Sequence, residues 1–172
     1  KAINDSNLKV YTAHTDGIRS IITIPGSNSF ITTGYDGKIF KWNLDNAVEQ
    51  PATIATNPIG NVNLAIDPKG KLLACGTDGI GIQLYDIENN FALRSTLKTP
   101  TNKIRNLLFL HDGKLISGGI NTELIVWNET FTNYSSFYKG NSKINGVRLS
   151  PSQNRLAIAQ QNGEVYLMSI DN

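Results

Sequence analysis

Short apolar runs recur along the whole chain, and each is closed by turn-forming residues. The runs hold four to seven residues rich in Ile, Val, Phe, Tyr and Thr, and Gly, Asn, Asp or Pro follows them. Such runs are typical of β-strands, whereas no stretch shows apolar positions at the three- and four-residue spacing of a helix. The pattern predicts an all-β protein.

The strand pattern repeats four times along the sequence. In the first repeat the expected strands cover residues 18–24, 30–33 and 38–43, and a weaker fourth strand covers 52–56. A large side chain closes the third strand of each repeat, and these positions lie 43, 42 and 41 residues apart: Trp42, Tyr85, Trp127 and Met168. A fixed period of this kind predicts a repeat architecture in which neighbouring units bury a common core.

Tight antiparallel hairpins are expected within each repeat. The second turn carries residues that tolerate positive φ, namely Asp36-Gly37, Asp78-Gly79, Asn121-Thr122 and Asn162-Gly163. The fourth repeat ends without a fourth strand, whereas a strand-like segment at residues 8–13 precedes the first repeat. Counting that segment with the last repeat gives four units of four strands.

Composition limits the function classes. The chain has 172 residues, 40% of them hydrophobic, which suits one compact domain. Its net charge of +2 is too small to indicate a nucleic acid or an anionic membrane as partner. The sequence has one cysteine, Cys75, and two histidines, which are few ligands for a metal cluster. No apolar stretch approaches the length of a membrane span. We therefore expect a cytoplasmic protein without metal, cofactor or membrane segment.

The residues of the first repeat resemble those of the WD40-repeat β-propellers, and the resemblance covers nearly the whole chain. Ala13-His14 stands at the family's Gly-His position, and Trp42-Asn43 stands where Trp-Asp is expected. Thr33 is assigned to the hydroxyl position, and Asp36 to the turn aspartate. The resemblance implies a structural relay from the indole N–H of Trp42 through Thr33 and His14 to Asp36.

The other repeats depart from this motif. The histidine position holds Asn57, Pro100 and Gly140, the hydroxyl position is assigned to Cys75, Gly118 and Ala159, and only Trp127 keeps the tryptophan. The full relay is therefore expected in the first repeat alone. The fold that the resemblance implies is a single WD40-type propeller over residues 1–172, with blades at 14–56, 57–98, 99–138 and 140–172 and the additional strand at 8–13.

Four blades raise the question of how the ring closes, because rings of this family commonly hold seven or eight blades. The favoured hypothesis is that the chain is part of a seven- or eight-bladed ring whose remaining blades belong to the same longer chain. A second hypothesis joins two copies into an eight-bladed ring, with the leading strand of each completing the last sheet of the other. Closure of one chain into a four-bladed ring is the third. Exposed sheet edges would otherwise remain unpaired.

The resemblance also suggests a binding surface at the channel rim, where strand ends and loops are held by a rigid ring. Of the twelve positions that alignment places there, four are basic and none is acidic. We expect the binding residues to be Arg19, Tyr35, Lys103, Arg105, Lys143 and Asn145. The hypothesis is that they contact an acidic or phosphorylated protein segment, with Lys103, Arg105 and Lys143 as the strongest patch. The alternative is an ordinary solvated face.

The favoured function is a non-enzymatic interaction scaffold or sensor that binds another protein or another domain of a longer parent chain. His14, Asp36 and a neighbouring hydroxyl could be taken for a nucleophilic triad, but the relay already accounts for them, so no catalytic residue is expected. Two alternatives remain open. One is a propeller enzyme with a site at the channel mouth, and the other is nucleic-acid binding by the basic rim.

Overall fold

The computed structural model describes residues 10–45, 50–101 and 103–170, and the described residues form strands and no helix. The strands of the first sheet are β1 (Ile18–Thr23), β2 (Ser29–Gly34), β3 (Lys38–Asn43) and β4 (Ala52–Thr56). The second sheet holds β5 (Asn61–Ile66), β6 (Leu72–Thr77), β7 (Ile82–Asp86) and β8 (Ala92–Leu97). The third holds β9 (Asn106–Phe109), β10 (Leu115–Gly118), β11 (Glu123–Trp127) and β12 (Tyr134–Lys139), and the fourth holds β13 (Ile144–Leu149), β14 (Arg155–Gln160) and β15 (Val165–Ser169).

Each sheet is an antiparallel meander in which strands pair in the order of the sequence. The central hairpin has one register in all four sheets, with the pairs Phe30–Trp42, Leu73–Tyr85, Leu115–Trp127 and Leu156–Met168 at equivalent places. A hairpin register is fixed by its turn and by which face is buried, and the repeat preserves both. The four-fold strand repeat expected from the sequence is therefore confirmed.

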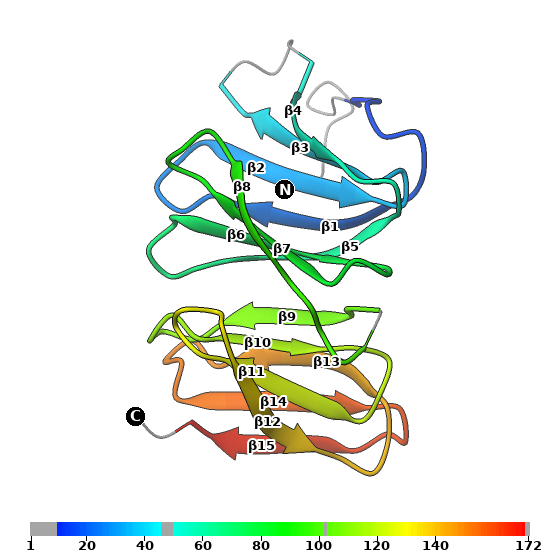
Figure 1. The fold of residues 1–172 in the computed structure, drawn as a ribbon, viewed down its shortest axis with the longest axis vertical. Helices are drawn as coiled ribbons and strands as arrows, with labels where there is room; N and C mark the ends of the chain where they lie inside the picture. Colours follow the sequence, from blue (N-terminus) through cyan, green and yellow to red (C-terminus); the bar gives the residue numbers. More distant parts are fainter. Residues whose placement is uncertain (1–9, 46–49, 102, 171–172) are drawn as a thin grey trace, which may run out of the picture.

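The sheets are the blades of a β-propeller; in Figure 1 blades one and two form the upper half, and blades three and four overlap in the lower half. The innermost strands lie side by side, β1 beside β5, β5 beside β9 and β9 beside β13. Three clusters of buried apolar side chains fill the spaces between consecutive blades. The blades thus share their cores, as the repeat pattern predicts.

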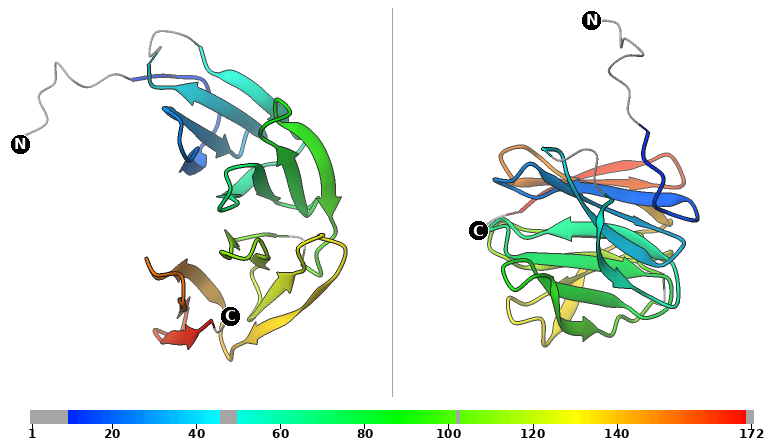
Figure 2. Two further views of the ribbon diagram at one scale, coloured as in Figure 1. Left: turned by 90° about the vertical axis from the view of Figure 1, so that its left-hand side faces the viewer. Right: turned by 90° about the horizontal axis from the view of Figure 1, so that it is seen from above.

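The described blades form an open arc, with blades one and four at its two ends (Figure 2). Blade four has three described strands, and β15 pairs only with β14. Of the expected strand at residues 8–13, residues 8 and 9 lie outside the described residues, and residues 10–13 are not assigned to a strand. Instead, the Tyr11 ring packs edge-on against Trp42, with centroids 5.8 Å apart.

No segment of the described chain forms a helix with the length and apolar character needed to span a bilayer.

Candidate functional site: a buried relay and the channel rim

A buried hydrogen-bond relay ties the loop before blade one to its central hairpin. Nδ1 of His14 lies 3.0 Å from each carboxylate oxygen of Asp36, and both side chains are nearly inaccessible, with 2% and 3% exposed. Nε2 of His14 lies 2.8 Å from the hydroxyl of Thr32, and the indole N–H of Trp42 donates to the same hydroxyl at 2.8 Å. When the imidazole is neutral and carries its proton on Nδ1, each hydrogen-bond donor of the relay has an acceptor.

The carboxylate at the end of the relay is held by the backbone as well. Oδ2 of Asp36 accepts the N–H of Thr15 at 3.0 Å, and Oδ1 accepts the N–H of Lys38 at 3.1 Å. Burial alone would raise the pKa of Asp36, but the hydrogen bonds from His14, Thr15 and Lys38 favour the charged form and hold the pKa below its usual value. The group therefore acts as an anchor for the hairpin.

The relay hydroxyl belongs to Thr32, and the assignment to Thr33 is wrong by one residue. Successive side chains of a strand point to opposite faces, so only one of two adjacent threonines can meet Trp42. Thr32 lies on the Trp42 face, whereas the Thr33 hydroxyl donates to the backbone carbonyl of Lys38 at 3.3 Å. The alternation of β2 could have shown this, because Phe30 pairs with Trp42 and Thr32 lies two residues further on the same face.

The same shift corrects blade three, where Gly118 was assigned to the hydroxyl position. Ser117 pairs with Ile125 just as Thr32 pairs with Phe40, and the indole N–H of Trp127 donates to its hydroxyl at 3.0 Å. In blade four the equivalent residue is Ile158 and not Ala159. Blade three therefore keeps the hydroxyl–indole half of the relay.

Blade two replaces the relay with a different buried network. The side-chain carbonyl of Gln83 accepts the hydroxyl of Tyr85 at 2.8 Å and the amide of Asn57 at 2.7 Å. Cys75 holds the hydroxyl position here, is fully buried, and has its pKa raised by burial to about 12. Burial likewise raises the pKa of Tyr85 to about 12. These groups stay neutral and serve the packing of the blade.

Among the described residues, no group of three or more His, Cys, Asp and Glu side chains is placed where it could hold a metal ion.

Of the residues expected at the channel rim, Arg19 and Tyr35 of blade one lie together. The guanidinium of Arg19 lies 5.2 Å from the centroid of the Tyr35 ring, and 43% of Tyr35 is exposed. The backbone N–H of Tyr35 donates to the carbonyl of Gly17, which fixes the start of β1 against the hairpin turn. An exposed aromatic ring beneath a cation offers rigid area for a partner.

Lys103 and Arg105 of blade three lie near the carboxylate of Asp78, which was expected only as a turn residue. Oδ2 of Asp78 lies 3.9 Å from Nζ of Lys103 and 3.8 Å from Nη2 of Arg105. None of the twelve aligned positions is acidic, but the turn aspartate of blade two, which is not one of them, faces the start of blade three. In blade one His14 binds the equivalent Asp36, whereas blade two has Asn57 at the position of His14.

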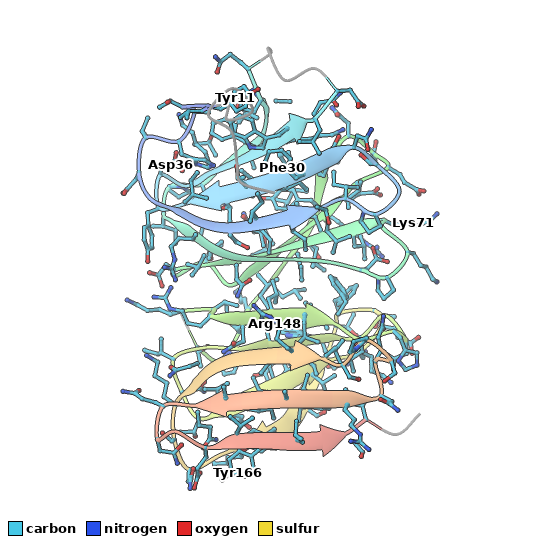
Figure 3. The ribbon with its side chains drawn as sticks, turned by 180° about the vertical axis from the view of Figure 1, so that it is seen from behind. Tyr11, Phe30, Asp36, Lys71, Arg148 and Tyr166 are labelled. Atoms are coloured by element: carbon cyan, nitrogen blue, oxygen red, sulfur yellow. The ribbon has the colours of Figure 1, made fainter. Side chains whose placement is uncertain are left out.

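Arg105 and Asn145 also line a common hollow of about 350 Å³, but Lys143 is not among its lining residues. The hollow lies on the inner side of the arc, where the start of blade three meets blade four. Its polar side chains are Asn63, Arg105, Asn106, Asn145 and Arg148, and no Asp or Glu lines it. Figure 3 shows Arg148 near the middle of the molecule, between the blades. Sequence reasoning missed three residues that line this hollow: Asn63 and Asn106 lie near the starts of β5 and β9, and Arg148 lies near the end of β13.

Comparison with known proteins agrees with this geometry. A sequence profile of the family described as "WD domain, G-beta repeat" matches residues 5–43, which hold the His14, Thr32, Asp36 and Trp42 relay. Two curated relatives, each called "Protein LST8 homolog", come from Drosophila melanogaster and Drosophila pseudoobscura pseudoobscura. Each is 26% identical over 145 residues, which is 81% of this chain and 45% of the relative, so the chain spans less than half of those proteins. The first repeat is thus similar to the WD40 repeat, the chain is similar to the LST8 homologs over most of its length, and its radially arranged blades have the β-propeller fold.

Proposed function

We propose that the chain is a non-enzymatic scaffold that binds an acidic or phosphorylated segment of a partner protein through the channel rim. Similarity to WD40-repeat proteins supports a protein-interaction role in general. The partner segment is supplied by another protein or by another domain of a longer parent chain. The observation that carries the proposal is the pair of cations around Asp78, next to a hollow lined by a second arginine.

The ion pairs at Asp78 leave both cations available to a ligand. Separations of 3.8 and 3.9 Å exceed the 2.7–2.9 Å of a charge-assisted hydrogen bond, so Asp78 attracts Lys103 and Arg105 without saturating them. Half of the Lys103 side chain is exposed, at 51%. An incoming carboxylate or phosphate can thus gain hydrogen bonds from these cations that Asp78 does not make.

The hollow beside them suits the same ligand chemistry. Arg105 and Arg148 supply positive charge, and the amides of Asn63 and Asn145 can donate to an anionic oxygen. Arg19 on Tyr35 adds a second anchoring point on blade one. An extended acidic segment that crosses the rim would therefore meet cations on blades one, three and four.

The test is a binding titration with fluorescently labelled peptides of equal length: an oligoglutamate, a phosphoserine peptide and an uncharged Gly-Ser peptide. Replacing Lys103, Arg105 and Lys143 together with Glu should weaken binding of the acidic peptides by at least about tenfold. The matched control replaces Lys69, Arg94 and Arg155 with Glu. These exposed cations lie outside the first strands of the blades, so the control should bind as the unchanged protein does.

A second variant gives the opposite sign and needs no charge reversal. Asp78→Asn removes the carboxylate that competes for Lys103 and Arg105, so it should tighten binding of the acidic peptides. Equal binding of all variants would overturn the proposal. Preference for a single-stranded DNA oligonucleotide over both acidic peptides, with a steep loss of affinity in salt, would assign the rim to nucleic acid instead.

A further inference from the structure

The imidazole of His14 has a defined place in blade one, and blade three has the same place without a histidine. In blade one the ring bonds to Thr32 and Asp36. Its edge packs against Phe40, with ring centroids 4.7 Å apart. Blade three has Pro100 at the position of His14. A proline side chain can neither donate nor accept a hydrogen bond, so it cannot join the two ends of a relay.

The residues that surround this place correspond in the two blades. The strand pairs Thr32–Phe40 and Ser117–Ile125 are equivalent by register. The turn residues Asp36 and Asn121 each lie two residues before the third strand of their blade. Blade three thus has a hydroxyl, an apolar side chain and an amide where blade one has a hydroxyl, an aromatic ring and a carboxylate.

A small cavity of blade three lies at this place. Ser117, Ile125 and Asn121 line it, and so do Pro100 and the residues before and after it. Its volume is about 10 Å³, which is close to the space that one water-sized sphere requires and too small for a larger ligand. The cavity therefore corresponds to the position of the His14 ring in blade one.

Two polar groups of the cavity lack a hydrogen-bond partner among the described residues. Oδ1 of Asn121 is buried and accepts no hydrogen bond from them. The Ser117 hydroxyl accepts the indole N–H of Trp127 at 3.0 Å, but its own proton meets no acceptor among them. A buried polar group without a partner is unfavourable. Further polar side chains belong to the lining, namely Thr99, Thr101 and Glu123.

We propose that blade three binds one buried water molecule in this cavity, at the place that the imidazole of His14 takes in blade one. The water accepts the hydroxyl proton of Ser117 and donates a proton to Oδ1 of Asn121. The relay then runs from the indole of Trp127 through Ser117 and the water to the turn, in the same direction as in blade one. A buried water commonly makes about three hydrogen bonds, and the lining supplies partners for them.

This water would hold the turn of blade three at a junction of blades. The backbone carbonyl of Asn121 accepts the N–H of Ile144, the first residue of β13 in blade four, at 3.3 Å. Thr101, on the other side of the cavity, lies in the segment that leads into blade three. Blade three packs on both blade two and blade four through buried apolar clusters. The water site is therefore enclosed by described blades on both sides.

The direct experiment is a high-resolution crystal structure of the protein. We expect one peak of solvent density within about 3.2 Å of both the Ser117 hydroxyl oxygen and the Asn121 side-chain oxygen. Blade one should show no such peak, because the imidazole fills the same place. A cavity without density, or density that contacts neither Ser117 nor Asn121, would overturn the proposal.

A double-mutant cycle tests the bridge in solution. Ser117→Ala and Asn121→Ala should each lower the melting temperature, and the double variant should lose less than the sum, because each change already breaks the same water bridge. The matched control combines Ser117→Ala with Asn154→Ala. Asn154 accepts the Ser152 hydroxyl at 2.6 Å in the turn between β13 and β14, so these two losses should add. Additive losses for Ser117 and Asn121 would contradict a shared water.

Histidine substitution tests whether the cavity is equivalent to the His14 place. Pro100→His supplies an imidazole that can displace the water, whereas Pro100→Phe supplies a ring without hydrogen-bonding atoms. Both remove the same proline, so the backbone effect cancels. The histidine variant should melt at the higher temperature, and adding Ser117→Ala to both should remove the difference. Equal melting temperatures of the two single variants would overturn the equivalence. No variant changes a rim cation, so the peptide titration fails or succeeds independently.

Discussion

At the scale of single residues, the relay shows how one hydroxyl can join two parts of a blade. Thr32 accepts the indole proton of Trp42 and lies within 2.8 Å of Nε2 of His14, so its loss leaves two buried groups without a partner. An unsatisfied buried donor or acceptor costs more than the bond itself contributes. The hydroxyl of its neighbour Thr33 donates to the Lys38 carbonyl at 3.3 Å.

Replacing each threonine with valine separates the two roles, because valine keeps the shape and removes only the hydroxyl. Thr32→Val should lower the free energy of unfolding by about 1–3 kcal/mol, and Thr33→Val by less than about 1 kcal/mol. Denaturant unfolding followed by tryptophan fluorescence measures both. Because both side chains are buried, a difference in burial does not explain the ranking. Equal losses, or a larger loss for Thr33→Val, would contradict the relay geometry.

The residue types of the relay were visible in the sequence, but their exact positions were not. His14, Asp36 and Trp42 have no chemically equivalent neighbours to be confused with, whereas two threonines stand side by side at 32 and 33. Only the strand register tells them apart. Asp78 was missed for a related reason, since its partners Lys103 and Arg105 belong to the next repeat and meet it through the packing of blades.

At the scale of elements, the strands follow directly from the alternation and the turn residues. The expected strand at 38–43 coincides with β3, and the expected fourth strand at 52–56 coincides with β4. Such agreement is physical, because an antiparallel meander depends on local turns and on one buried face per strand. The segment at residues 10–13 differs because a strand needs an edge to pair with, and no described edge lies beside it.

The turn between β2 and β3 offers a test of how closely the blades approach. Gly37 has φ of +74°, and a side chain there would collide with the backbone carbonyl of Asn57 before blade two. Gly26, in the preceding turn, has nearly the same φ of +69° and open space around it. Gly26→Ala should therefore cost about 1–2 kcal/mol from backbone strain alone. Gly37→Ala should cost at least about 1 kcal/mol more, because the collision is added.

Thermal unfolding of the two alanine variants measures this difference, with the parent as reference. The pair shares a residue change and a backbone conformation, so the difference isolates the contact between the hairpin turn and the chain entering blade two. Equal melting temperatures of the two variants would show that the turn at Gly37 can shift to accommodate a side chain without a loss of stability. The close approach of Gly37 to Asn57 would then not stabilise the junction between blades.

At the scale of the whole molecule, the sequence indicated repeated blades but not how the ring closes. The sequence period shows what each blade shares with the next. Closure of the ring depends instead on the blade faces at the two ends of the arc. Among the described residues, Ile21 and Val165 are exposed, whereas the residues at equivalent places in the interior blades are buried.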